Sequence, residues 1–376
     1  MICALQICYG GGCNFIQVSA VPLKQWSNAN EGEAHMNWFE GNKDEVLIIG
    51  EVAQAHDGSL GAAHAYIDAI ADAGADVVKF QTHIAASEST KQEPWRVKFS
   101  YEDDLRYDYW ERMQFTQEQW KGLKDHAEDR GLVFLSTPFS VDAAKMLDRL
   151  GMTMWKISSG EVSDPWLLEF ILSTKKPIIF STGMSTEEEV DCYAKNLTSH
   201  AAQFALLQCT TNYPVAPERV GLNILEQFLN KYPIVGLSDH SGEMWPSLSA
   251  VTMGAKIIEV HVCLSKYDFG PDVPASLTQE KFAEMIRGIR YISKLKKNPV
   301  DKDAVSSELS RNSQIFAKSV CANTPIAKGT VLTREMLALK KPANGIPARE
   351  VESIIGKTVN RDFEIDDFIK YSDIGE

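Results

Sequence analysis

Two histidines, His240 and His261, stand near the ends of two apolar runs, VGLSDH and KIIEVHV. Alternate side chains of a strand share one face, so His240 would point the same way as Ser238. By the same rule His261 would share a face with Glu259. If the runs are neighbouring strands of a barrel, the imidazoles converge at its C-terminal mouth, the usual place of the active site. Two neutral imidazoles there predict a divalent metal, whereas a lone histidine at a strand end is more often a hydrogen-bonded structural residue.

Two lysines, Lys79 and Lys156, fall on the strand faces that would point into the same barrel. A buried lysine is costly unless it is paired, so two of them in one barrel mouth predict an anionic ligand such as a phosphate or carboxylate. The alternative is an internal salt-bridge network, in which the lysines pair with Glu51, Glu161 and Glu259.

The elements that would position these residues are eight short apolar runs alternating with helical patterns. The runs cover residues 46–51, 76–82, 132–137, 154–159, 177–182, 204–210, 233–239 and 256–262. Capping-box spacing at Thr116 with Gln119, and at Ser185 with Glu188, predicts two helix starts between them. A last long helix is expected over about 278–295. Alternating strands and helices of this number predict an α/β fold, a (β/α)₈ TIM barrel.

The remaining segments differ from the barrel in composition. Residues 1–44 contain a Gly-Gly-Gly stretch and little periodicity, and we expect a poorly ordered N-terminal tail. Residues 45–296 form the predicted barrel, and a lysine-rich linker follows over 297–316. Residues 317–376 have turn signals and short apolar stretches, which predict a small β-rich C-terminal module.

Composition excludes several classes of partner. The 376 residues carry 38 Lys and Arg against 51 Asp and Glu, a formal charge of −13, with no long basic run. Nucleic acid and anionic membrane surfaces are therefore poor partners. The sequence contains no run of 18 apolar residues, the length needed to span a membrane. The seven cysteines show neither a disulfide framework nor a CxxC zinc pattern, which fits a reducing compartment and predicts a cytoplasmic protein.

Eight sequence strings, in order from about residue 46, resemble the sialic acid synthase family, which includes the legionaminic and pseudaminic acid synthases. The strings are IIGEVAQAHDGSL, GADVVKFQT, FLSTPFS, WKISSGE, IIFSTGMS, CTTNYPV, GLSDHS and GPDVPASL. The C-terminal module resembles the antifreeze-like (SAF) domain of these synthases. The resemblance implies condensation of phosphoenolpyruvate with the open-chain aldehyde of an N-acylated, N-acetylmannosamine-like amino sugar, which gives a nine-carbon α-keto acid and phosphate.

The resemblance also implies roles for individual residues. His240 and His261 would hold a divalent metal, Mn²⁺ first, with Mg²⁺ or Co²⁺ as alternatives, that polarises the aldehyde oxygen. Glu51 would orient or activate the water that attacks C2. Phosphoenolpyruvate would be held by Lys79, Lys156, Thr137, Ser159, Ser181 and Ser238. The sugar is assigned to Gln81, Glu161, Tyr213 and Asp272, and Phe139 and Lys341 complete the substrate-binding set. A domain-swapped homodimer is implied, the C-terminal module of one chain capping the barrel of the other.

The sequence departs from the family pattern in three places. Lys340-Lys341-Pro342 stands where the family has Lys-Arg-Pro, and lysine lacks the planar fork of arginine. Ala55-His56-Asp57-Gly58 lacks the family's asparagine. The aromatic and charged segment 84–115 does not align with sialic acid members. It is either a specificity lid that includes Arg96, or a loop that its aromatic residues dock on the barrel rim.

Two other functions fit a barrel of this kind. One is a related phosphoenolpyruvate-dependent aldose-phosphate synthase, although its products would not call for the C-terminal module. The other is a non-catalytic sugar-binding barrel. The joint presence of the predicted catalytic residues argues against the second; these are Glu51, Lys79, Lys156, His240 and His261. Sequence alone leaves open which sugar is accepted and whether it carries a 6-phosphate.

Overall fold

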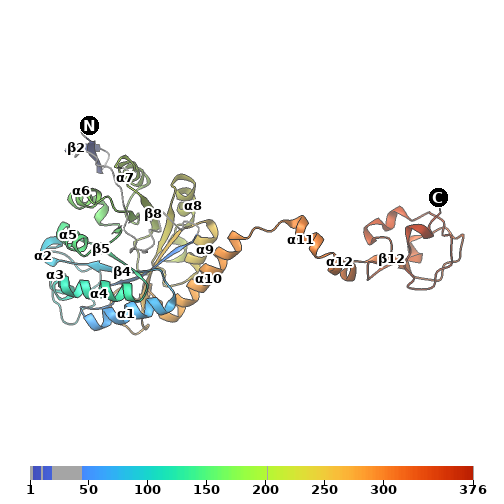
Figure 1. The fold of residues 1–376 in the computed structure, drawn as a ribbon, viewed down its shortest axis with the longest axis horizontal. Helices are drawn as coiled ribbons and strands as arrows, with labels where there is room; N and C mark the ends of the chain where they lie inside the picture. Colours follow the sequence, from blue (N-terminus) through green and yellow to red (C-terminus); the bar gives the residue numbers. More distant parts are fainter. Residues whose placement is uncertain (1–2, 10–11, 19–44, 201, 376) are drawn as a thin grey trace. The chain divides into compact units, whose positions relative to one another are not determined.

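The computed structural model describes residues 3–9, 12–18, 45–200 and 202–375. The chain divides into two compact units, residues 1–297 and 298–376. Figure 1 shows the first unit as strands enclosed by helices, and the second as a small, mostly irregular module.

Eight parallel strands form a nearly closed barrel, as predicted. Along the hydrogen-bonded path they are β5 (Val133–Pro138), β4 (Val77–Thr82), β3 (Leu47–Ala53), β10 (Ile257–Cys263), β9 (Val235–Asp239), β8 (Phe204–Cys209), β7 (Ile178–Ser181) and β6 (Trp155–Ile157). The end strands β5 and β6 contact each other. A short strand, β11 (Leu277–Thr278), extends the sheet beside β10. The two histidine-bearing runs are therefore neighbours, because β9 pairs with β10.

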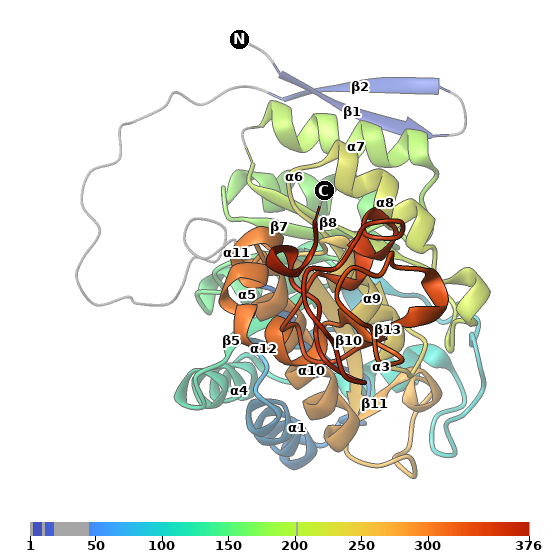
Figure 2. The same cartoon turned by 90° about the vertical axis from the view of Figure 1, so that its right-hand side faces the viewer.

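Helices surround the barrel on its outside (Figures 1 and 2). They are α1 (Leu60–Ala73), α4 (Gln117–Asp129), α5 (Val141–Arg149), α6 (Pro165–Ser173), α7 (Glu187–Ser199), α8 (Leu222–Lys231), α9 (Trp245–Met253) and α10 (Gln279–Lys297). Three short 3₁₀ turns follow strands at the site: η1 (Glu161–Ser163), η2 (Pro217–Arg219) and η3 (Val273–Ala275). The long closing helix expected over about 278–295 is α10.

Helix starts follow the capping signals with one shift. The capping box predicted at the start of α4 is confirmed. The box predicted at Ser185 and Glu188 is wrong by one residue, because Thr186 and Glu189 form it at the start of α7. Ser185 lies one residue earlier, in a turn that its backbone N–H closes with the carbonyl of Thr182.

Strand alternation separates an apolar outer face of the barrel from a polar inner one. Phe80 and Ile258 are buried in the main apolar core, which the helices cover. Lys79, Lys156 and Glu259 are buried as well, yet they face the barrel interior. Burying charged groups costs free energy unless they are paired. The charged residues inside the barrel must therefore have partners or a functional role, whereas the apolar residues of the outer core need neither.

The segments outside the barrel are short. Strands β1 (Cys3–Tyr9) and β2 (Gly12–Val18) pair antiparallel within the predicted tail. The other residues of that tail lie outside the described residues, so its order stays a prediction. The predicted linker contains helices α11 (Lys302–Glu308) and α12 (Ser310–Phe316). No helix in the described part of the chain is long and apolar enough to cross a membrane.

The second unit has its own small core. Strands β12 (Ser319–Ala322) and β13 (Leu337–Lys340) pair antiparallel, and isolated bridges join the loops around them. Its 3₁₀ turns are η4 (Arg334–Met336), η5 (Ala348–Ser353) and η6 (Tyr371–Asp373). Nine buried apolar residues form the core, among them Val320, Ile346 and Phe363. The β-rich module expected from the sequence is present, with fewer regular strands than the pattern suggested.

Candidate active site

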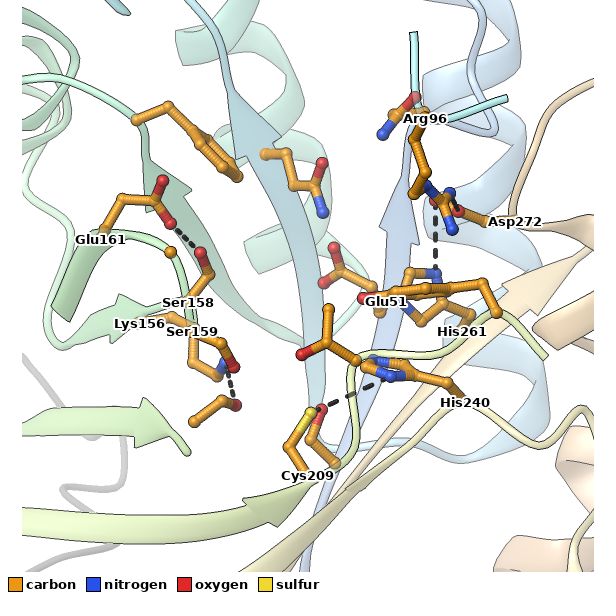
Figure 3. A pocket seen from close by; sticks show the side chains of 18 of the residues that line it. Glu51, Arg96, Lys156, Ser158, Ser159, Glu161, Cys209, His240, His261 and Asp272 are labelled. Carbon is orange, nitrogen blue, oxygen red and sulfur yellow. Dashed lines mark hydrogen bonds and ion pairs between the residues drawn. The ribbon is translucent and has the colours of Figure 1, made fainter. Parts of the chain in front are cut away.

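A cavity of about 520 Å³ opens at the carboxyl ends of the barrel strands. The predicted site residues that line it are Glu51, Lys79, Gln81, Phe139, Lys156, Ser159, Glu161, Ser181, Tyr213, Ser238, His240, His261 and Asp272. They come from many strands and loops, so only the closed barrel brings them together. Figure 3 shows Lys156, Ser158, Ser159 and Glu161 on one side of the cavity, across from the two histidines.

The two histidines are close, buried and held in fixed orientations. Their ring centroids are 5.2 Å apart at an interplanar angle of 72°. The backbone carbonyl of Thr210 lies 3.0 Å from Nδ1 of His240. When it accepts a hydrogen bond from the Nδ1–H group, the available lone pair is on Nε2. Tyr213 stacks on His240 at 4.1 Å and meets His261 edge-on at 5.6 Å. On His261, Nδ1 lies 4.0 Å from Oδ2 of Asp272.

Both imidazoles are neutral at physiological pH. Burial lowers the pKa of His240 to about 3, helped by the neighbouring His261. Burial also lowers the pKa of His261 to about 3, and the Lys79 ammonium adds to the shift. A neutral imidazole with an available lone pair is the form that ligates metals.

The residues fit a divalent ion that takes most of its ligands from elsewhere. Among the described residues, no group of three or more His, Cys, Asp or Glu is arranged to hold a metal ion. Structural zinc, which needs four protein ligands, therefore does not fit. Two imidazole nitrogens suit an ion such as Mn²⁺ that completes its shell with water and substrate oxygen. The metal stays a prediction.

Lysines and glutamates alternate on the cavity floor. Lys79 donates to Oε2 of Glu51 at 2.5 Å, and its Nζ lies 3.7 Å from Oε1 of Glu259. Lys156 donates to Ser181 at 2.8 Å, with Nζ 3.4 Å from the same Glu259 oxygen. The internal salt-bridge network considered from the sequence is therefore present, without Glu161. All four charged groups still line the cavity, so the network and a ligand site use the same atoms.

Burial sets the charge state of the floor. It raises the pKa of Glu51 to about 7, against the opposing pull of Lys79. It would also raise the pKa of Glu259, but Lys156 and Lys79 outweigh it and hold that pKa at about 2. Burial and the neighbouring Lys79 lower the pKa of Lys156. Oε1 of Glu51 and Oε2 of Glu259 are buried without hydrogen-bond partners, so the floor keeps two unsatisfied acceptors.

Hydroxyls and one glycine shape the side of the cavity beside Lys156. Ser158 donates a hydrogen bond to Glu161, whose pKa burial raises to about 7. The backbone N–H of Gly183 donates to Oγ of Ser159 at 2.9 Å. A Cβ at Gly183 would come within 2.3 Å of Oγ1 of Thr211, so this close approach requires glycine.

The segment that did not align, residues 84–115, adds to the cavity wall. It contains α2 (Ala85–Glu88) and α3 (Arg106–Met113). Five of its residues line the cavity: Glu88, Glu93, Arg96, Arg106 and Trp110. Its aromatic side chains also pack on one another in a separate small core. The segment is therefore packed by its aromatic residues, and its polar residues reach the cavity, while its role as a specificity lid stays a prediction.

Comparison with known proteins decides the family. Residues 66–301 match the NeuB family and residues 317–375 match the SAF domain. The chain belongs to the NeuB family. It is 34% identical to the N,N'-diacetyllegionaminic acid synthase of Campylobacter jejuni, over 87% of this chain and 99% of that relative. It is 29% identical to the human N-acetylneuraminate-9-phosphate synthase, over 88% and 92%.

A solved structure agrees with this assignment. The N-acetylneuraminic acid synthetase of Leptospira borgpetersenii, in complex with citrate, is 26% identical and superposes with a TM-score of 0.64, covering 72% of this chain and 93% of that one. The named relatives of this NeuB member are synthases, and it is an enzyme.

One predicted substrate residue of this NeuB member does not line the cavity, and another belongs to the second unit. Thr137 does not line the cavity; its hydroxyl is buried without a hydrogen-bond partner, beside Gln81 in the register of β4 and β5. Lys341 belongs to the second unit, where it is exposed, with its Nζ 5.3 Å from the ring centroid of Phe316. Its role in substrate binding stays a prediction.

Sequence reasoning missed several lining residues. His83, which was not singled out from the sequence, stacks on Trp110 at 4.0 Å and on Phe139 at 4.5 Å, and its Nδ1 lies 2.7 Å from Glu88. The usable signal was its place immediately after β4, where barrel loops carry function. Cys209 also lines the cavity, but burial raises its pKa to about 11, so it remains a neutral thiol.

Proposed function

We propose that this enzyme condenses phosphoenolpyruvate with the open-chain aldehyde of an N-acylated amino sugar, releasing phosphate and forming a nonulosonic acid. The observation that carries the proposal is one cavity holding two buried lysines and two neutral histidines. The relatives are named for the synthesis of acids of this class. The citrate in the related synthetase supports a site for a carboxylate-bearing anion.

The cavity offers each substrate a distinct half. Lys79 and Lys156 supply cations for the phosphate and carboxylate of phosphoenolpyruvate. The serine hydroxyls that line the cavity beside them supply neutral donors; these are Ser159, Ser181 and Ser238. The sugar would lie across the cavity, beside Tyr213 and Asp272. Holding both substrates in one cavity makes carbon–carbon bond formation effectively intramolecular.

The reaction forms one carbon–carbon bond and breaks one carbon–oxygen bond. C3 of phosphoenolpyruvate attacks the aldehyde carbon, and the positive charge that develops at C2 is stabilised by the nearby carboxylate of Glu51. Water then adds at C2 and gives its proton to Glu51, whose pKa of about 7 suits a proton acceptor. The bond from C2 to the phosphate oxygen breaks as the new hydroxyl at C2 loses its proton and becomes the ketone. The two protons of the water end on the alkoxide formed from the aldehyde and on the phosphate, which leaves beside Lys79 and Lys156.

His240 and His261 would hold a divalent ion, with Mn²⁺ preferred and Mg²⁺ or Co²⁺ as alternatives, which polarises the aldehyde oxygen when bound. The neutral state of both rings supports this assignment. Asp272, whose Oδ2 lies 4.0 Å from Nδ1 of His261, would bind the sugar.

An assay of phosphate release tests the proposal. The enzyme is incubated with phosphoenolpyruvate and Mn²⁺, and each of a panel of N-acyl amino sugars and aldose phosphates is offered as acceptor. We expect release with at least one N-acyl amino sugar, a nine-carbon α-keto acid by mass spectrometry, and loss of release with EDTA. Release only with aldose phosphates would support the other synthase class. No release with any acceptor would contradict both.

We also propose a homodimer in which the C-terminal unit of one chain caps the barrel of its partner. Residues 317–375 match the SAF domain, the module that this arrangement requires. Light scattering after size exclusion should give twice the 41.9 kDa chain mass. A monomer at micromolar concentration would refute the arrangement.

A further inference from the structure

Residues 84–115, called the β4 insert below, are fixed against the barrel. Arg112 in α3 donates to the carbonyl of Asp57 at 2.9 Å and to the carboxylate of Asp103 at 2.9 Å. Gly58 has φ +75, and a Cβ there would come within 2.6 Å of the Arg112 carbonyl. The hydroxyl of Tyr109 donates to Gln54 at 3.2 Å. These contacts anchor α3 of the insert to the loop after β3.

Arg96 extends from the β4 insert to the histidine side of the cavity. Its Nη2 donates to Oδ1 of Asp272 at 2.6 Å, and its guanidinium carbon lies 4.4 Å from the ring centroid of Tyr213. That ring stacks on His240. Figure 3 shows Arg96 and Asp272 together beside His261, across the cavity from Lys156. Arg96 thus lies where the sugar, and not phosphoenolpyruvate, is expected.

The guanidinium of Arg96 keeps hydrogen-bonding capacity for a ligand. In the described part of the chain, Asp272 is its only hydrogen-bond partner, whereas a guanidinium carries five N–H donors. Its side chain is 37% exposed while that of Asp272 is 9% exposed. Stacking on Tyr213 holds the plane of the guanidinium. The remaining N–H groups are therefore free to bind oxygen atoms in the cavity.

The charges around Arg96 disfavour an anionic group on the sugar. Arg96 is already paired with Asp272, and Arg106 lies 3.3 Å from Glu93. Glu88 adds a third carboxylate to this part of the cavity wall. A sugar phosphate bound to the free N–H groups of Arg96 would bring negative charge next to these carboxylates, whereas a hydroxyl or amide oxygen accepts from Arg96 without adding charge.

We propose that Arg96 is a specificity-determining residue that binds the hydroxyl or N-acyl oxygens of an unphosphorylated sugar acceptor. The inference rests on the proposed function and deepens it. The named relatives leave the point open, since one forms N,N'-diacetyllegionaminic acid and another forms a 9-phosphate.

Steady-state kinetics of Arg96→Ala, Arg96→Lys and Lys91→Ala test the assignment. Losing hydrogen bonds from a charged donor should raise the KM for the sugar about 10- to 100-fold, with the KM for phosphoenolpyruvate unchanged. Arg96→Lys keeps the charge beside Asp272 but loses the planar fork, so most of the rise should remain. Lys91 is an exposed cation on the same insert that does not line the cavity, and its variant should behave as wild type.

Two outcomes would overturn the role of Arg96 while leaving the proposed function intact. One is full restoration of the sugar KM by Arg96→Lys, which would show that Arg96 only neutralises Asp272. The other is an equal rise in KM for both substrates, which would indicate a structural role.

A pair of acceptors, an N-acyl hexosamine and its 6-phosphate, tests the substrate class with the wild-type enzyme. We expect the unphosphorylated sugar to have the higher kcat/KM, by about tenfold or more. Preference for the 6-phosphate would overturn the inference about the acceptor but confirm the condensation. Failure of the wild-type enzyme with every acceptor would contradict the proposed function itself.

Discussion

Replacing Lys156 with methionine separates the two roles that a buried lysine could have. Burial lowers the pKa of Lys156, so its ammonium costs free energy in the folded enzyme. If the lysine serves ligand binding, the Lys156→Met variant should fold as well as the wild type and lose affinity for phosphoenolpyruvate. If it serves the internal ion-pair network, the variant should be unstable and its affinity should fall less.

The structure gives the size of each effect. Without Lys156, the Glu259 carboxylate still has Lys79 at 3.7 Å and the Ser238 hydroxyl at 3.1 Å, so no charge is left alone. Replacing a buried ion by an apolar group of similar volume is often neutral or stabilising, by about 1–4 kcal/mol. Glu259→Gln instead leaves Lys156 without a carboxylate partner, although Lys79 keeps Glu51, and should cost about 3–5 kcal/mol.

Binding and unfolding measured on the same samples decide between these roles. Calorimetry should show phosphoenolpyruvate binding weakened about 10- to 100-fold in Lys156→Met, the loss expected for hydrogen bonds to a charged group. Thermal unfolding should give a Tm equal to or above that of the wild type. A fall in stability of about 3 kcal/mol or more, with phosphoenolpyruvate affinity retained, would refute the reasoning and leave Lys156 a structural residue.

Three further predictions concern other parts of the site. His261→Ala should abolish Mn²⁺ binding in calorimetry and lower kcat by at least about 100-fold with an unchanged Tm, and full activity would remove the metal assignment. Burial raises the pKa of Glu161 from 4.5 to about 7, so folding stability should fall as pH rises through this range. Glu161→Gln should therefore raise the Tm at pH 8 but not at pH 4. An equal shift in Tm at both pH values would argue against titration of Glu161. Gly58→Ala should lower the free energy of unfolding by about 1–2 kcal/mol, measured through the Tm. The reason is that Gly58 has φ +75 and an added Cβ would clash with the Arg112 carbonyl. An unchanged Tm would show that the β4 insert can move away from this Cβ at no cost in stability.

The inward-facing residues of the strands were predictable because strand alternation has a fixed period. Once VGLSDH and KIIEVHV are neighbouring strands, His240 and His261 must meet, and they do, at a centroid distance of 5.2 Å. The same alternation placed Lys79 and Lys156 inside the barrel. Of the three partners named for the lysines, Glu51 and Glu259 pair with them and Glu161 does not, because these distances depend on the stagger of strands far apart in the chain.

Local motifs failed where the sequence allowed two solutions. In the stretch STEEE, both Ser185 with Glu188 and Thr186 with Glu189 have capping-box spacing, and the backbone of the preceding turn selects the second. The contacts of the β4 insert could not be predicted, for a different reason. It has no periodicity, so the contact of Arg96 with Asp272, 176 residues later, follows from tertiary packing alone.

The ion-pair network and the ligand site need not be alternatives. Glu51 and Glu259 each keep one buried oxygen without a hydrogen-bond partner, which an optimised structural network would have satisfied. An incoming anion can take the lysine hydrogens, which releases Glu51, whose pKa lies near 7, to act as the carboxylate that accepts the proton of water. The glutamates thus keep two lysines charged and in place until the anion arrives. On this view the free energy lost in burying four charged groups is the cost of a preorganised site, and Lys156→Met should recover part of it.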